Sequence, residues 1–180
     1  MPSELPQRAY LRDEFHLLTL NATVQRARIY AEAVEEEPRE AFRRTLRQQL
    51  DLIARAYVHP VSDQEHVRNI ERLAASLSRK HGSILRLARF RIGPAQKALN
   101  LFLKYLWCVG WIAEPPHCPF DARVIGLLPV GVRVSWTELD SRVGYMRLVS
   151  AARAVAGDVP LPIWELTAYN SVSNAARRST

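Results

Sequence analysis

Three lysines stand out among the basic residues of this 180-residue chain. The chain has 25 Lys and Arg residues, but only Lys80, Lys97 and Lys104 are lysine. A lysine amine whose pKa is lowered by burial or by a nearby cation can attack carbon and form a Schiff base, whereas arginine stays protonated. Lys97 and Lys104 are seven residues apart and so share one helical face. Lys97 could then act as a nucleophile, with Lys104 as its neighbouring cation. Two alternatives stay open: Lys104 is the nucleophile, or both lysines form the solvated edge of a helix.

A carboxylate follows a segment that cannot be helical. Asp121 comes directly after residues 114–120, where three prolines remove backbone donors and restrict the residues before them. A fixed carboxylate beside a carbon that develops positive charge lowers the barrier to breaking its bond. Asp121 is also a natural N-cap for a short helix over 121–128. The sequence therefore leaves a catalytic and a capping role open.

Further side chains could surround a substrate. Asn100 lies one helical turn from Lys97 and could bond a substrate, or cap a buried backbone group. The tryptophans and Phe120 could include a stacking platform for a flat ring, or belong to the core. The candidate substrate contacts are Arg89, Arg91, Gly93, Asn100, Lys104, Trp107, His117 and Trp136.

The sequence gives no pattern for a metal or a cofactor. His117, Cys118 and Cys108 offer at most three soft ligands and no repeated Cys-x-x-Cys pair. The sequence contains no phosphate-binding glycine loop, no Gly-x-Ser-x-Gly elbow and no metalloprotease motif. We therefore expect neither a metal nor a cofactor.

Helices must position these residues. Ser62 opens one of them with a capping box, and Pro160 and Pro162 introduce the last. We expect a short helix over 83–89, a tight turn over 91–93 and a long helix over 94–108. Residues 130–135 alternate between apolar and polar, so a short extended piece is possible there. Apolar residues at helical spacing predict further helices over about 17–31, 38–57, 62–77 and 137–157. We predict one all-α domain over 1–180, with N-terminal helices over about 10–82 and the hairpin, Pro-rich loop and closing helices over 83–170.

Residues 83–128 thus run as helix, tight glycine turn, helix, Pro-rich loop and Asp, which resembles the helix-hairpin-helix DNA glycosylase superfamily. The hairpin would be Arg91-Ile92-Gly93, with Lys97 on its second helix and Asp121 ending the loop. The run Lys97-Ala-Leu-Asn-Leu-Phe-Leu-Lys104 is most similar to the archaeal 8-oxoguanine glycosylase branch, which also places a basic residue seven positions after the reactive lysine. The resemblance implies a glycosylase-like helical fold. It also implies an enzyme that flips a modified base out of duplex DNA and excises it, with or without lyase activity. Lys97 and Asp121 would be its catalytic residues. This chain has one glycine where the family usually has two, and Lys97 follows Gly93 by four residues instead of two.

The charge of the chain indicates a polyanionic partner. The formal net charge is +7, and the stretch from Lys80 to Lys104 contains no Asp or Glu. Each contact between a cation and a DNA phosphate releases condensed counterions. We therefore expect a monomer that binds DNA. Two other interpretations stay open: a non-catalytic DNA-binding module that holds a phosphate on the N–H groups of the Gly93 turn and the Pro94 helix start, and a helical interaction protein whose charge is incidental.

The longest apolar run does not reach the ~20 residues of a membrane span. It covers 98–111 and is interrupted by Asn100 and Lys104. The first residues contain no apolar core of a signal peptide, and two cysteines make no disulfide framework. We expect a cytoplasmic protein without membrane contact.

Overall fold

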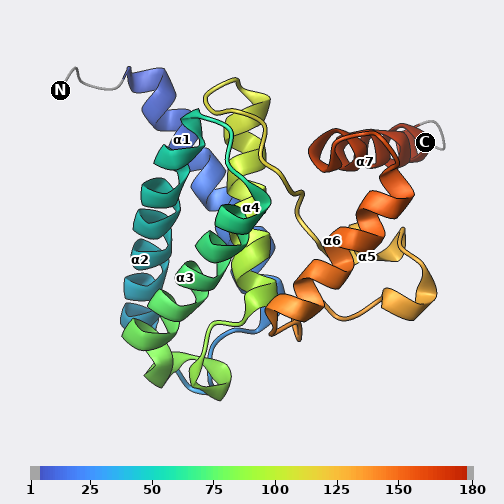
Figure 1. Cartoon of the computed structure of the whole chain (residues 1–180). Coiled ribbons are helices and arrows are strands. Elements are labelled where there is room, and N and C mark those ends of the chain that lie inside the picture. Colours follow the sequence, from blue (N-terminus) through green and yellow to red (C-terminus); the bar gives the residue numbers. More distant parts are fainter. Residues whose placement is uncertain (1–4, 178–180) are drawn as a thin grey trace.

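The computed structural model describes residues 5–177, and these residues form helices joined by short turns and loops (Figure 1). The main helices are α1 (Pro6–Leu20), α2 (Glu36–Ala54), α3 (Asp63–His81), α4 (Ile92–Cys108), α5 (Ala122–Gly126), α6 (Arg142–Ala156) and α7 (Leu161–Arg177). Single turns of π- or 3₁₀-helix are η1 (Asn21–Gln25), η2 (Arg55–Val58), η3 (Gly82–Ile84), η4 (Arg86–Ala88) and η5 (Val130–Val132). Over the described range there is no β-strand, only one isolated bridge between Tyr30 and Leu85. The predicted all-α class is confirmed.

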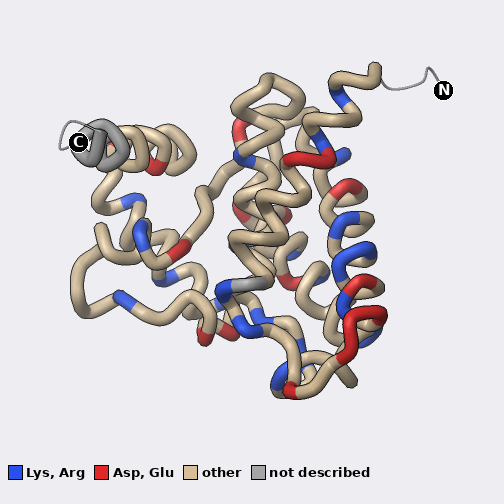
Figure 2. The backbone as a smooth tube through the Cα atoms, turned by 180° about the vertical axis from the view of Figure 1, so that it is seen from behind, with Lys and Arg blue, Asp and Glu red and all other residues tan. Residues whose placement is uncertain are grey.

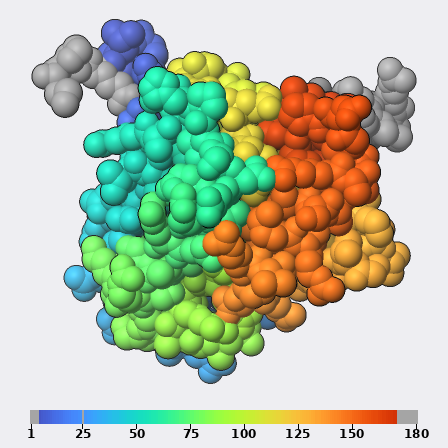
Figure 3. Space-filling view, in the orientation of Figure 1, coloured from blue at the N-terminus to red at the C-terminus, as the bar shows by residue number. Residues whose placement is uncertain are grey.

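Helix α4 is the centre of the molecule. It packs against α1, α2, α3 and α6, and its residues from Gly93 to Leu103 are all buried. Figures 1 and 3 show α2 and α3 on one side of the molecule and the C-terminal helices α6 and α7 on the other. One cluster of buried apolar side chains extends from Leu20 to Leu161, so the two sides share a core. Because helices surround α4, its polar side chains must find partners inside the protein.

Local capping fixes several helix ends. The Ser62 hydroxyl accepts a hydrogen bond from the Glu65 N–H at 3.3 Å, as the capping box predicts. Gly157 ends α6 in the left-handed region, with φ 62°. Helix α6 begins at Arg142, later than the predicted 137, and Ser141 caps it by accepting from the Gly144 N–H at 3.0 Å. None of the described helices is long and apolar enough to cross a lipid bilayer.

The structure corrects the predicted hairpin. Residues 83–89 form 3₁₀ turns, not an α-helix, because Leu87 and Ala88 have φ values of 59° and 55°, which no α-helix accommodates. The chain here pairs with an earlier segment: the Arg86 N–H donates to the Ile29 carbonyl at 2.8 Å. Gly93 lies in the first turn of α4 and not in a tight turn before it. Residues 130–135 contain a 3₁₀ turn and no strand.

Candidate functional site

A cavity of about 360 Å³ lies beside the middle of α4. This volume is within the usual range for sites that bind small molecules. Its wall is built by η1, α4, the end of the Pro-rich segment and α7. The lining residues are Ala22, Arg26, Lys97, Leu101, Lys104, Tyr105, Pro119, Asp121, Arg123, Glu165, Leu166, Tyr169 and Asn170. Both candidate lysines and the candidate aspartate therefore line one cavity.

Lys97 is the most buried cation of this cavity, with only 3% of its surface exposed. Its Nζ lies 4.1 Å from the centre of the Trp136 ring, a cation–π contact. Burial lowers the pKa of Lys97, Asp121 opposes that change, and the positive charge of Arg26 adds to it. The cavity thus contains an amine that is more easily deprotonated than an exposed lysine and that has a carboxylate close by.

Lys104 has a different environment. Its Nζ donates to both carboxylate oxygens of Glu165, at 2.8 and 2.7 Å, and lies 5.1 Å from the centre of the Tyr169 ring. An ammonium group bonded to a carboxylate in this way has no lone pair to offer a substrate. Arg26 is the cation whose charge adds to the effect of burial on the pKa of Lys97, whereas the charge of Lys104 is paired with that of Glu165. Burial raises the pKa of Glu165, and Lys104 offsets part of the increase.

Asp121 caps α5 and lines the cavity at once. One carboxylate oxygen, Oδ1, accepts hydrogen bonds from the N–H groups of Arg123 and Val124, at 2.9 and 3.1 Å. These two bonds hold the carboxylate in one orientation at the N-terminus of the short helix. The two roles left open by the sequence are therefore compatible, because a cap that is held in place is also a fixed negative charge.

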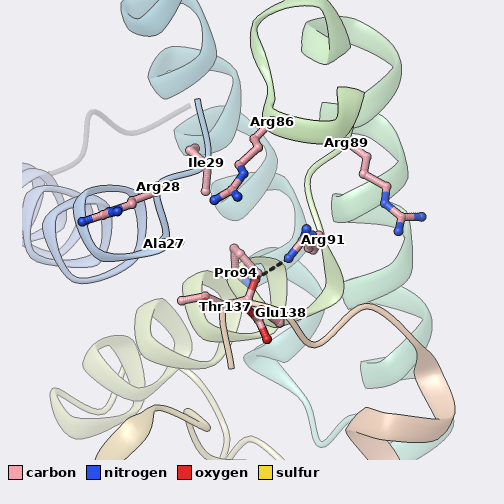
Figure 4. Close-up of a pocket in the computed structure, with 9 residues that line it drawn as sticks. All are labelled: Ala27, Arg28, Ile29, Arg86, Arg89, Arg91, Pro94, Thr137 and Glu138. Carbon is pink, nitrogen blue, oxygen red and sulfur yellow. Dashed lines mark hydrogen bonds between the residues drawn. The ribbon is translucent and has the colours of Figure 1, made fainter. Parts of the chain in front are cut away.

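A second, smaller pocket of about 90 Å³ is rich in arginine (Figure 4). Arg28, Arg86, Arg89 and Arg91 line it together with Pro94, which lies one helical turn before Lys97. Arg91 donates to the Thr137 carbonyl at 3.2 Å, as the dashed line in Figure 4 shows, and Arg89 pairs with Asp140. Figure 2 shows Lys and Arg segments near the beginning of α4. We call this the arginine pocket.

Gly93 serves the packing of α4. A Cβ atom on this residue would lie 1.7 Å from the carbonyl oxygen of Trp136, so only glycine fits against that backbone. The Gly93 N–H donates to the Leu139 carbonyl at 2.7 Å, and Pro94 has no N–H. Gly93 and Pro94 themselves therefore have no free N–H group to offer a phosphate.

Of the expected substrate contacts, Lys104 lines the cavity, Arg89 and Arg91 line the arginine pocket, and the others line neither. Asn100 and His117 have no exposed surface, and both bond the hydroxyl of Tyr145, at 3.2 and 2.7 Å. They are reassigned to the protein interior. Trp107 is half-buried near the end of α4 and does not line the cavity, whereas Trp136 reaches Lys97 through its ring.

The sequence did not single out Glu165, Arg26 or Tyr169. Glu165 is the sole acidic residue after Asp158 and is flanked by Trp164 and Leu166, which is a pattern that marks a carboxylate on an apolar helix. Arg26 and Tyr169 have no comparable feature. Among residues 5–177, no three His, Cys, Asp or Glu side chains lie close enough together to hold a metal.

The fold and site define an all-helical protein with a buried lysine and a capping aspartate in one cavity. Neither protein-family models nor curated proteins nor solved structures give a match to this chain. Its function must therefore be argued from the geometry of the cavity.

Proposed function

We propose that this protein is a DNA glycosylase with lyase activity, which flips a modified base out of duplex DNA and cleaves its bond to the sugar. One observation carries the proposal: Lys97 and Asp121 line the same cavity. A buried amine and a fixed carboxylate are the two groups that this reaction requires, because the sugar develops positive charge as the bond breaks.

In the proposed reaction, the lone pair of the Lys97 amine forms a bond to C1′ of the sugar. The bond between C1′ and the base breaks, and its electron pair leaves with the base, which takes up a proton. The bond between C1′ and the ring oxygen O4′ then breaks, O4′ takes up a proton that the Lys97 nitrogen loses, and the opened sugar is held as a protonated Schiff base between Lys97 and C1′. Asp121 stabilises the positive charge on the sugar, and the lowered pKa of Lys97 makes the neutral amine accessible.

The arginine pocket fits the DNA backbone in this proposal. Arg28 and Arg86 are exposed, and the structure gives neither an ion pair within residues 5–177. Arg26, on the cavity wall, is two residues from Arg28, so cations extend from the arginine pocket to Lys97. Arginine binds phosphates through parallel N–H donors, and such contacts would hold a strand while one nucleotide enters the cavity.

Borohydride trapping tests the proposal. Wild-type protein is incubated with duplexes that each carry one modified base or an abasic site, and borohydride reduces the Schiff base to a stable amine. Lys97→Gln should abolish the covalent adduct but keep DNA binding, whereas Lys80→Gln, the control on the exposed end of α3, should form it normally. If Lys104→Gln abolishes the adduct and Lys97→Gln still forms it, the nucleophile is Lys104.

Asp121→Asn tests the carboxylate separately. Asparagine can still cap α5, so the variant should fold and bind DNA, yet lose most of its base excision, on the order of 100-fold or more. Full excision activity in Asp121→Asn would leave this residue with the capping role alone.

The arginine pocket also supports a second candidate function, a DNA-binding module without catalysis. Such a module would bind DNA with a steep salt dependence but yield no adduct and no excised base. A chain that binds no DNA at all would instead be a helical interaction protein.

A further inference from the structure

Gln96 joins the helix that carries Lys97 to the loop that carries Asp121. It is fully buried on α4, next to Lys97 in sequence. Its side-chain Nε2 donates to the Phe120 carbonyl at 2.8 Å, and its Oε1 accepts from the Phe120 N–H at 3.2 Å. Phe120 directly precedes Asp121. The amide of Gln96 thus satisfies both backbone groups of one residue, as a neighbouring strand would.

The backbone of the Pro-rich segment has few anchors besides Gln96. Three of the residues in 114–120 are prolines and have no N–H, and in the described chain no backbone–backbone hydrogen bond involves this segment. A segment of this kind cannot hold itself in place through regular secondary structure. The two bonds from Gln96 come at its last residue, immediately before the carboxylate.

The orientation of the Gln96 amide is itself fixed. Asn100, one turn further along α4, donates to Gln96 Oε1 at 3.1 Å and to the Tyr145 hydroxyl at 3.2 Å. The same hydroxyl bonds His117 Nδ1 at 2.7 Å. This chain of buried groups leaves Gln96 with one arrangement that satisfies its partners, and buried polar networks of this kind make a structure rigid. It also gives Asn100 and His117 a role that fits their burial.

We infer that Gln96 is a positioning residue, which holds the Asp121 carboxylate at a fixed place relative to the Lys97 amine. The inference rests on the proposed function for its catalytic consequence. Successive residues of an α-helix point about 100° apart, so Gln96 faces the loop while Lys97 faces the cavity. One helix turn therefore sets the position of the amine and, through Phe120, that of the carboxylate.

The test compares Gln96→Met, which keeps the length of the side chain but neither donates nor accepts, with wild type. Gln96→Glu is a second variant that keeps the acceptor for the Phe120 N–H. Thr45→Val is the matched control: it removes a buried hydroxyl that bonds His81 Nε2 at 2.9 Å, outside the chain of hydrogen bonds through Gln96, Asn100, Tyr145 and His117. All variants are first compared in thermal unfolding, so that a general loss of stability is measured separately.

The first readout is amide hydrogen exchange, which needs no substrate. The Phe120 amide should exchange roughly tenfold faster or more in Gln96→Met, less so in Gln96→Glu, and at the wild-type rate in Thr45→Val. An unchanged rate in Gln96→Met would overturn the anchoring.

The second readout separates two reactions. Excision of an intact base needs Asp121 in place, and a misplacement of about 1 Å lowers such a rate on the order of 100-fold. Adduct formation at a preformed abasic site needs the Lys97 amine and no leaving base, so it should stay near the wild-type rate. Equal losses in both reactions would overturn the positioning role. A wild-type protein that excises no base would refute the proposed function, while the exchange of Phe120 would still decide the anchoring.

Discussion

Replacing Gly93 by alanine tests the packing of α4 against the segment before α6. The new Cβ would lie 1.7 Å from the carbonyl oxygen of Trp136, 2.9 Å from its carbonyl carbon and 3.1 Å from the carbonyl oxygen of Leu139. These neighbours are backbone atoms, so no side-chain rotation relieves the contact. The helix and the 136–139 segment must move apart, which also stretches the 2.7 Å bond between the Gly93 N–H and the Leu139 carbonyl.

The size of the effect follows from these contacts. Overpacking of a tight interior costs about 1–3 kcal/mol, and losing a hydrogen bond costs about 1 kcal/mol. The higher helix propensity of alanine stabilises the folded state by up to about 1 kcal/mol. We expect Gly93→Ala to lower the free energy of unfolding by about 1–4 kcal/mol, which at this chain length lowers Tm by roughly 2–4 °C for each kcal/mol.

Urea unfolding followed by circular dichroism measures the change. Gly126→Ala is the matched control, since nothing lies within 4 Å of the Cβ it would add at the end of α5. That variant should stay within about 0.5 kcal/mol of wild type. Wild-type stability in Gly93→Ala, together with weaker DNA binding, would refute the packing argument and favour a phosphate at this glycine.

Other expectations follow from the charges. Burial lowers the pKa of His66 to about 3, below its unfolded value near 6.5. The unfolded chain then binds the extra proton, so this histidine makes stability fall by about 1.4 kcal/mol per unit as pH drops from 6.5 toward 3. In urea unfolding measured across this pH range, the stability of His66→Asn should depend less steeply on pH than that of wild type. An equal dependence would refute the burial of His66 in its neutral form. Reversing Arg28 and Arg86 to Glu should reduce the slope of log K against log salt for DNA by about 2, measured by fluorescence anisotropy, and an unchanged slope would place the DNA elsewhere. Arg26→Gln should raise the pKa of Lys97 and shift the pH profile of adduct trapping upward, whereas an unshifted profile would exclude Arg26 as the cation.

Local sequence determined much of the secondary structure. Helical periodicity, the capping box at Ser62, the N-cap at Asp121 and the stop at Gly157 act within a few residues, so they can be read from the chain alone. The seven-residue spacing of Lys97 and Lys104 placed both on one helical face, and both line the cavity.

Local patterns failed where the backbone bonds a distant segment. The local pattern predicted a helix over 83–89. Instead, the Arg86 N–H bonds the Ile29 carbonyl and the Ile84 carbonyl bonds the Ala31 N–H, more than 50 positions away. Gly93 read as a turn or a phosphate contact, yet it is required by the backbone of Trp136. Neither partner could be inferred from nearby residues, since the choice depends on how the helices pack.

The tertiary structure alone decided what the cavity contains. Lys104 meets Glu165 across 61 residues, and Gln96 meets Phe120 across 24. The sequence supplied a lysine and an aspartate with suitable chemistry, but their shared cavity exists because α4 packs between the N-terminal helices and the C-terminal ones. Burial changes the pKa of Lys97 and fixes its surroundings, and burial is a property of packing that no single segment encodes.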